Sequence, residues 1–403
     1  MGTASQTVFN MRGKGIRLGT ERTRALLDVL GSPDDKLKII HVAGTNGKGS
    51  VCEYLTQILI AAGKKVGTYT TPEVFCFEEQ FRINGKYSAA LTEKYISAVQ
   101  IVADKMDDKP TAYERQTAAA FLMFSEEGCE YAVIECCMGG LLDTTNAVNK
   151  KLVAVITSIS LEHTAWLGNT ITEICRHKAG IIKNCLAIVS ACVQGEARDY
   201  FAALGCTFAG DDLQVISSGT EGTHFLCGGH KYFTKMVGEK QPYNAAAAIA
   251  AARVIGIDEG AIERGVSNAQ LAGRVQIIAR GNKTYILDGA HNPESFIPLC
   301  GAIKKFFAGR SCAAIFGCLG DKDIKSDLKA LKSAFGSITA VFPPSYRAMD
   351  ASQILENCRE VYPAAILKES VAEALRYTDA DVVAVCGSFT LLKEAKQWID
   401  REQ

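Results

Sequence analysis

Residues 41–50 read HVAGTNGKGS, a glycine-rich stretch that ends in lysine, glycine and serine. It stands between an apolar segment of strand length, 37–42, and a helical pattern, 50–59. A strand, a glycine loop and a helix in this order direct backbone N–H groups toward an anion, and the helix N-terminus adds partial positive charge. The stretch therefore predicts a phosphate-binding loop. It departs from the usual spacing G-x-x-x-x-G-K-[ST], because Gly49 separates the lysine from the serine.

The residues of this loop have expected roles. Lys48 would reach the terminal phosphate oxygens, and the hydroxyl group of Ser50 would bind Mg²⁺. The other members of the nucleotide site are Gly44, Thr45, Asn46, Gly47 and Gly49. A glycine-rich turn that binds nothing is the alternative, which the flanking strand and helix make the weaker interpretation.

Apolar segments of strand length alternate with helical patterns along the chain, which is typical of a parallel sheet covered by helices on both faces. After residue 195 the pattern becomes mixed, and short segments there fit an antiparallel appendage. The alternation restarts after the polar break ARGNK at 279–283. We therefore expect an α/β protein with a P-loop parallel-sheet domain, residues 1–280, and a smaller Rossmann-like α/β domain, residues 281–403.

Composition limits the function classes. Lys and Arg number 44 and Asp and Glu number 44, which argues against a nucleic-acid-binding surface. No apolar run approaches the roughly 20 residues that a membrane span needs. The 15 cysteines are an odd number scattered through apolar segments, which favours free thiols and a reducing cytoplasm.

Six blocks of sequence resemble, in the same order, the folylpolyglutamate synthase and dihydrofolate synthase family of Mur-type amide ligases. The separated lysine and serine of the first block are the family's own form of the loop. The blocks are HVAGTNGKGS (41–50), IECCMGGLLDTTN (134–146), ITSISLEHTAWLG (156–168), HKAGIIK (177–183), LAGR (271–274) and LDGAHNP (287–293).

Two blocks concern metal ions. Glu135 follows an apolar strand, so its carboxylate would emerge at the carboxyl end of the sheet and suit Mg²⁺. His163 alone favours a structural role, because imidazole is an unusual Mg²⁺ ligand. The family, however, uses the matching histidine at a second metal. The resemblance therefore implies two Mg²⁺ ions, with Ser50, Glu135 and His163 as protein ligands.

Lys178 lies in a largely apolar helical segment, and a lysine near metals and phosphate can have a lowered pKa and react with CO₂. Family members often carry a carbamylated lysine at the matching position. A surface lysine and a direct phosphate contact are the alternatives for Lys178.

Four residues nearer the C-terminus complete the expected site. Asn244 opens a helical pattern as an N-cap or, by the resemblance, faces the nucleotide. Arg274 precedes the domain boundary and would reach phosphates from the cleft between domains. By the resemblance, Asp288 and His291 orient ATP from the second domain, although an Asp-Gly turn is the plainer interpretation of Asp288.

The resemblance implies a reaction. ATP would phosphorylate a substrate carboxylate, and an amine would displace phosphate from the acyl phosphate. The expected catalytic residues are Lys48, His163, Lys178 and Arg274. We expect a cytoplasmic, monomeric ligase of small molecules that adds L-glutamate to folates, to dihydropteroate or to both.

The resemblance weakens in TPEVFCFEEQ, residues 71–80, which borders the pterin site in the family. Glu73 stands at a histidine position there and Gln80 at an arginine position, while Leu141 stands at an arginine position of the second block. Lineage variation or a different acceptor would explain these changes. Two alternatives remain: a Mur-type ligase for another acid and amino acid, and a P-loop ATPase switch.

Overall fold

The structure is a computed structural model that describes residues 3–11, 15, 17–320, 323–345 and 348–401. The chain divides into two compact units. Unit 1 comprises Met1–Ile216, His224–Thr234 and Gln241–Ala269, and unit 2 comprises Ser217–Thr223, Lys235–Lys240 and Gln270–Gln403. Within the described ranges, no helix combines the length and apolar character needed to cross a membrane.

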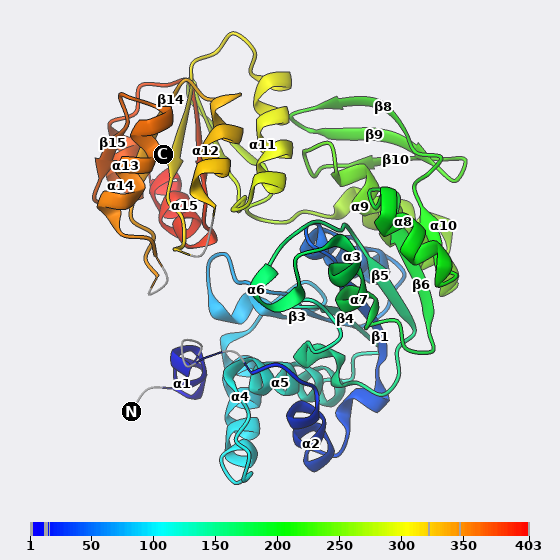
Figure 1. Ribbon diagram of the computed structural model, residues 1–403. Helices are drawn as coiled ribbons and strands as arrows, with labels where there is room; N and C mark the ends of the chain where they lie inside the picture. Colours follow the sequence, from blue (N-terminus) through cyan, green and yellow to red (C-terminus); the bar gives the residue numbers. More distant parts are fainter. Residues whose placement is uncertain (1–2, 12–14, 16, 321–322, 346–347, 402–403) are drawn as a thin grey trace. The chain divides into compact units, whose positions relative to one another are not determined.

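A seven-stranded sheet forms the centre of unit 1 (Figure 1). Its strand order is β3-β2-β4-β1-β5-β6-β7, and every neighbouring pair is parallel except β2 with β3. The central strands are apolar and buried, which confirms the expected parallel sheet covered by helices. The strands are β1 (Lys38–Ala43), β2 (Val66–Tyr69), β3 (Phe81–Ile83), β4 (Tyr131–Glu135), β5 (Val153–Ile156), β6 (Leu186–Ser190) and β7 (Thr207–Ala209).

The helices of unit 1 pack in three groups. The first group contains the helix that follows the glycine loop, the second covers β1 and β4 with aromatic and aliphatic side chains, and the third follows β5 and β6. The groups are α3 (Lys48–Ala61), α9 (Gln241–Val254) and α10 (Glu259–Asn268); α1 (Ala4–Met11), α2 (Glu21–Val29), α4 (Ala89–Ala103) and α5 (Ala112–Glu126); and α6 (Thr164–Leu167), α7 (Ile171–Ala179) and α8 (Gly195–Ala203).

The mixed region after residue 195 contains a three-stranded sheet of order β10-β9-β8. Its strands are β8 (Gln214–Gly219), β9 (Gly222–Cys227) and β10 (His230–Thr234). Two glycines connect β9 to β10, and ring contacts join Phe225 to Tyr232 and His224 to Phe233. The residue numbers rise along β9 as their partners' numbers fall along β10, which is the pairing of an antiparallel hairpin. The strands β9 and β10 therefore form the antiparallel appendage that the sequence predicts.

Unit 2 contains a six-stranded sheet of order β11-β12-β16-β13-β14-β15, in which only β11 and β12 are antiparallel. Its core joins Phe296, Phe316 and Leu328. The strands are β11 (Gln276–Arg280), β12 (Lys283–Leu287), β13 (Cys312–Phe316), β14 (Ser337–Val341), β15 (Ile366–Lys368) and β16 (Val382–Cys386). The helices are α11 (Pro293–Phe306), α12 (Ile324–Lys332), α13 (Ala351–Val361), α14 (Val371–Arg376) and α15 (Leu392–Arg401).

The last boundary between unit 1 and unit 2 lies between Ala269 and Gln270, and not at Arg280. The polar break at 279–283 is the turn between β11 and β12, whose backbones pair from Gln276 with Leu287 to Arg280 with Lys283. Strand pairing therefore places β11 in unit 2, although the sequence analysis assigns it to the first domain.

Candidate active site

The glycine loop connects the end of β1 to the start of α3. Gly47 is the N-cap of α3 and has a left-handed backbone, with φ of 88°. A Cβ atom at this position would lie 2.5 Å from the Oδ1 atom of Asn244. Gly44 also has a positive φ, and a Cβ atom there would collide with the hydroxyl group of Thr157. The two glycines therefore permit both the backbone conformation and the close approach of neighbouring side chains.

The segment after β5 holds the loop in place. The backbone N–H of Thr45 donates to the carbonyl oxygen of Ser158 at 2.8 Å. The N–H of Asn46 donates to the Ser158 hydroxyl at 2.9 Å, and the Thr157 hydroxyl donates to the Asn46 carbonyl at 2.6 Å. Thr157 and Ser158 were not predicted, although hydroxyl residues directly after a buried strand were a visible signal.

Lys48 and Ser50 lie at the start of α3. The ammonium group of Lys48 donates to the carbonyl oxygens of Gly44, at 3.1 Å, and Thr45, at 2.9 Å, so its charge lies over the loop. Ser50 is buried, and its hydroxyl oxygen accepts a hydrogen bond of 3.4 Å from Nε2 of Gln241. Gln241 is a further contact of this site that the sequence analysis missed.

Asn244 contacts the loop from inside α9. The helix begins at Gln241, so Asn244 is not its N-cap and that interpretation is wrong. Its Nδ2 atom donates to Oε1 of Gln241 at 3.3 Å, and its Oδ1 atom faces Gly47. The alternative interpretation, in which Asn244 faces the nucleotide, stays a prediction; its side chain lies against Gly47 of the glycine loop.

Glu135 is the last residue of β4 and is buried. In the parallel pair β1 and β4 its Cα is opposite Val42, so the carboxylate and the glycine loop lie at the same edge of the sheet. The Oε2 atom accepts a hydrogen bond of 3.2 Å from the N–H of Thr71, where residues 71–80 begin.

Lys178 lies in the last turn of α7 and is only 2% exposed. Burial, as the largest cause, and the positive charge of Lys48 lower the pKa of its amine to about 7, although the carboxylate of Glu162 opposes the shift. A lysine with this pKa is largely a neutral, nucleophilic amine in weak alkali.

His163 follows Glu162 and has a left-handed backbone, with φ of 51°, which is uncommon outside glycine. Its Nε2 atom lies 3.8 Å from Oε1 of Glu162. Glu162 therefore interacts electrostatically with both His163 and Lys178, and it is a candidate residue that the sequence analysis quoted without assigning a role.

The oxygen donors Glu135 and Ser50 suit Mg²⁺ better than a metal ion that is coordinated by protein side chains alone. In the part of the chain that the structure describes, no three side chains among His, Cys, Asp and Glu gather to hold a metal. Mg²⁺ needs only one or two carboxylates, because it keeps waters and takes phosphate oxygens. The buried carboxylate of Glu135 and the hydroxyl group of Ser50, at one edge of the sheet, suit such an ion.

The other three predicted residues, Arg274, Asp288 and His291, belong to unit 2, and two of them, Arg274 and His291, contact the ring of Phe389. The guanidinium carbon of Arg274 lies 4.6 Å from the centre of the Phe389 ring, and the His291 ring lies 6.0 Å from it. Phe389 follows β16 and was not predicted; a signal for it was the Gly-Ser-Phe sequence after a buried strand.

Asp288 is a buried acceptor for two backbone groups and not only a turn residue. Its carboxylate accepts hydrogen bonds from the N–H groups of Val275, at 2.6 Å, and Ala290, at 2.7 Å. Burial raises its pKa to about 6, although the charge of Arg274 and these two bonds oppose the rise. Val275 has φ of 44°, a strained conformation for a β-branched residue, so Asp288 stabilises an unusual backbone beside Arg274.

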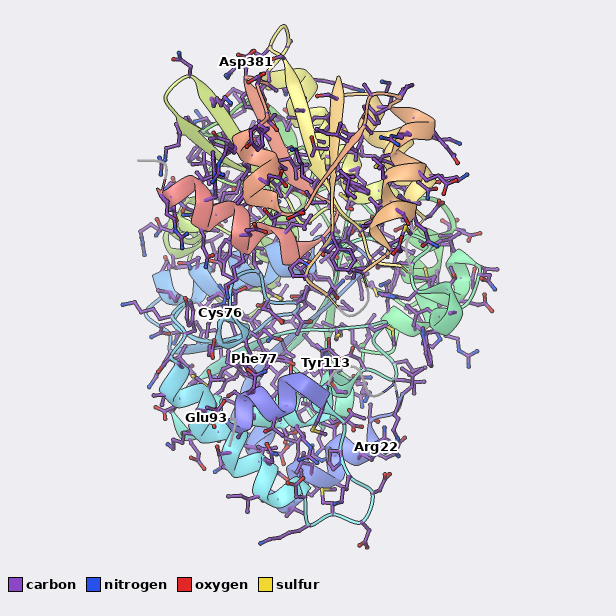
Figure 2. All side chains as sticks on the ribbon, turned by 90° about the vertical axis from the view of Figure 1, so that its left-hand side faces the viewer. Arg22, Cys76, Phe77, Glu93, Tyr113 and Asp381 are labelled. Atoms are coloured by element: carbon purple, nitrogen blue, oxygen red, sulfur yellow. The ribbon has the colours of Figure 1, made fainter. Side chains whose placement is uncertain are left out.

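Residues 71–80, where the resemblance weakens, form a folded loop. The carboxylate of Glu79 accepts from the N–H groups of Val74 and Phe75, and the N–H of Thr70 donates to the carbonyl oxygen of Gln80. Gln80 is buried, and its Nε2 atom donates to the carbonyl oxygen of Phe77 at 2.9 Å. Figure 2 shows Cys76 and Phe77 in this loop, on the same face of unit 1 as Glu93.

Comparisons with known proteins identify the family of the chain. The Mur ligase middle domain matches residues 42–252, and the glutamate ligase domain of Mur ligases matches residues 273–389. The chain is 32% identical to the dihydrofolate synthase/folylpolyglutamate synthase of Escherichia coli (strain K12), over 97% of this chain and 93% of that protein.

Two solved structures have the same fold. FolC of E. coli in complex with DHPP and ADP superposes with a TM-score of 0.88 at 30% identity, covering 100% of this chain and 98% of that chain. A bifunctional folylpolyglutamate synthase/dihydrofolate synthase with Mn, AMPPNP and L-glutamate bound superposes with a TM-score of 0.85 at 28% identity, covering 99% and 98%. The chain therefore belongs to the Mur ligases, in the family of the dihydrofolate synthase/folylpolyglutamate synthases.

Proposed function

We propose that this protein is an ATP-dependent ligase that joins L-glutamate to folates, to dihydropteroate or to both. The observation that carries the proposal is the glycine loop, in which Lys48 covers the backbone and which begins at the same edge of the sheet as the carboxylate of Glu135. Relatives with bound ADP, AMPPNP and L-glutamate support the choice of substrates.

The reaction has two steps. An oxygen of the acceptor carboxylate attacks the γ-phosphorus of ATP, which releases ADP and gives an acyl phosphate. The neutral amine of glutamate then attacks the acyl carbon, the C–O bond to phosphate breaks, and the amine loses a proton as the amide forms. Lys48 and Arg274 contribute positive charge near the phosphates, where positioning and charge neutralisation govern the rate.

Metal ions complete the proposed site. Bound Mg²⁺ would neutralise phosphate charge, and Ser50, Glu135 and His163 would hold up to two such ions. We propose that the neutral amine of Lys178 adds to CO₂ and loses a proton, which gives a carbamate. The pKa of about 7 supports this reaction, since only the neutral amine is nucleophilic.

The remaining assignments belong to the same proposal. Asn244 and the loop residues Gly44–Gly49 bind the nucleotide, while Asp288 and His291 orient ATP. The protein acts as a cytoplasmic monomer; its 15 cysteines, an odd number scattered through apolar segments, favour a reducing compartment.

The test is a coupled phosphate-release assay with ATP, Mg²⁺ and L-glutamate, and with dihydropteroate and tetrahydrofolate as separate acceptors. Mass spectrometry identifies the glutamylated product. Phosphate release should require both the acceptor and glutamate. Release that is independent of both would favour an ATPase switch, and release with another acid or amino acid from a panel, but with neither pterin, would favour a different ligase.

A further inference from the structure

Lys151 is a buried cation that the proposed reaction does not use. It precedes β5 and is 9% exposed. Burial lowers the pKa of its amine to about 8. Burying an ammonium group is costly unless its hydrogen bonds are satisfied, so the partners of Lys151 indicate what it stabilises.

Those partners connect two loops. The Nζ atom of Lys151 donates to the carbonyl oxygen of Ile181 at 2.8 Å and to Oδ1 of Asn146. The Nδ2 atom of Asn146 donates to the carbonyl oxygens of Leu141 and Gly180, each at 3.0 Å. We name Asn146 and Lys151, with the carbonyl groups they contact, the α7 clamp.

The clamp joins the 141–146 loop to the chain directly after α7. The N–H of Leu141 also donates to the carbonyl oxygen of His177 at 2.7 Å. Glycines permit this close approach, since a Cβ atom at Gly140 would lie 2.8 Å from the carbonyl oxygen of His177. Lys178 lies between His177 and Gly180, so both of its flanks are fixed by these bonds.

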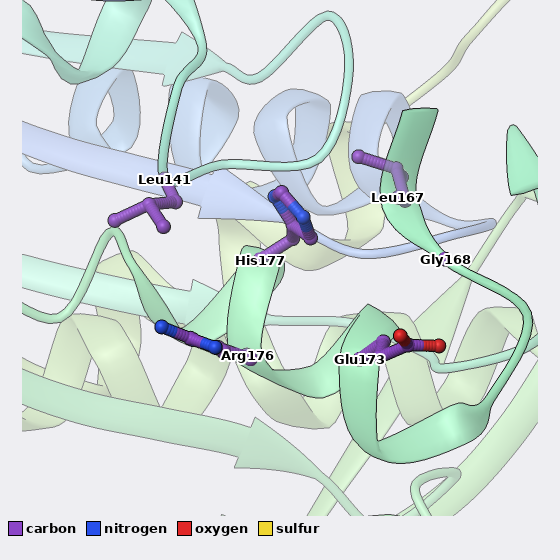
Figure 3. A pocket seen from close by; sticks show the side chains of 6 residues that line it. All are labelled: Leu141, Leu167, Gly168, Glu173, Arg176 and His177. Carbon is purple, nitrogen blue, oxygen red and sulfur yellow. The ribbon is translucent and has the colours of Figure 1, made fainter. Parts of the chain in front are cut away.

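One side of the last turn of α7 borders a pocket and not a packed neighbour. A cavity of about 340 Å³ lies there, lined by Leu141, Leu167, Gly168, Glu173, Arg176 and His177 (Figure 3). A helix end beside a cavity lacks the contacts that a packed neighbour would supply. Its position therefore depends more strongly on hydrogen bonds to its carbonyl groups.

We propose that Asn146 and Lys151 are positioning residues that fix Lys178 for catalysis through the last turn of α7. The effect on the reaction rests on the function proposed above, whereas the effect on α7 itself does not. A small displacement of a catalytic group lowers turnover while leaving substrate binding largely unchanged, and this pattern distinguishes positioning from binding.

The test compares Lys151→Met with Lys150→Met, which removes the exposed neighbouring lysine. In Lys151→Met, turnover at saturating substrates should fall about 100-fold, with the KM for ATP changed less than about threefold. Hydrogen exchange in peptides that cover 177–183 should rise about tenfold, while exchange in α11 stays unchanged. Lys150→Met should match the unmodified protein in every measurement.

A second variant serves if Lys151→Met does not fold. Asn146→Asp keeps an acceptor for Lys151 but loses the two N–H donors to Leu141 and Gly180, so the same kinetic and exchange pattern is expected. Unchanged exchange at 177–183 in the folded variants would overturn the proposal, as would full turnover in either of them. If the unmodified protein ligates no glutamate, the proposed function fails, and the exchange measurements alone decide whether the clamp holds α7.

Discussion

The ammonium nitrogen of Lys48 lies 3.1 Å from the carbonyl oxygen of Gly44 and donates a hydrogen bond to it. The charge is therefore already over the loop before any phosphate binds. Groups held in advance in this way need little reorganisation when charge develops on the substrate, which is the main source of electrostatic catalysis.

Lys48→Met should abolish most ligation and leave the fold intact. Removing one charge that stabilises a transition state lowers turnover by about 10²–10³-fold. The thermal midpoint should change little, because the Lys48 ammonium contacts loop carbonyls and not the core. The coupled assay and a melting curve measure the two effects, with Lys36→Met, an exposed lysine, as the control. Unchanged turnover would show that phosphate binds elsewhere.

Gly47→Ala should impair nucleotide binding more than its backbone strain alone explains. Gly63 has a similar positive φ, of 71° against 88°, but a Cβ atom there meets nothing within 4 Å. Gly63→Ala should therefore cost about 1–2 kcal/mol of stability without affecting ATP affinity. Gly47→Ala adds the collision with Asn244 and should weaken ATP binding at least about tenfold, as calorimetry would measure. Equal ATP affinity in the two variants would contradict the role assigned to this contact.

Periodicity and motif order predicted the α/β class, the parallel sheet and the family, because these depend on local apolar patterns and on short motifs. The position of Asn244 was predicted only in part. Its place relative to Gln241 depends on where α9 begins, and Pro242, a residue typical of the first helical turn, was the signal that the helix starts before Asn244. The hydroxyl groups after β5 were a visible signal, but the partner of Thr157 was not, since its contact with Asn46 joins residues 111 positions apart.

The domain boundary shows a second limit. A polar turn and a linker have similar composition, and only the pairing of β11 with β12 distinguishes them. The burial of Lys178 was equally invisible, because it depends on packing by segments distant in sequence.

Lys178 should make stability depend on pH above neutrality. Its pKa is about 7 in the folded protein and 10.5 ordinarily, so between these values the unfolded chain binds more protons. Stability should therefore rise with pH across this window, and Lys178→Met should lack that rise. Denaturant titrations of both proteins in CO₂-free buffer measure the difference. Parallel curves for the two proteins would show that Lys178 is not buried as a neutral amine.

Asp288 should make the stability of the fold decrease with rising pH in acid, which is the opposite of the dependence expected from Lys178. Its pKa is about 6 when folded and 3.8 ordinarily, so the folded protein binds more protons in this window and its stability falls as pH rises through it. Asp288→Asn should lack this slope. The variant should also lose about 1–3 kcal/mol at neutral pH, because its amide cannot accept from both Val275 and Ala290. Denaturant titrations from pH 4 to pH 7 test both effects; an unaltered slope in the variant would exclude Asp288 as its source.

Substitution of Gln80 distinguishes lineage variation from a different acceptor as the explanation of the changes in residues 71–80. Its side chain is 1% exposed and donates to the carbonyl oxygen of Phe77. An arginine there would bury a charge without a matched partner, so Gln80→Arg should lower the stability of the fold by about 2 kcal/mol or more. Glu73→His, at a half-buried position, should lower the stability far less.

Melting curves measure these losses of stability, and the coupled assay with dihydropteroate and tetrahydrofolate measures acceptor preference. A destabilised Gln80→Arg protein with unchanged preference identifies Gln80 as part of the loop's packing. A stable variant with a reversed preference would instead make this position a determinant of the acceptor.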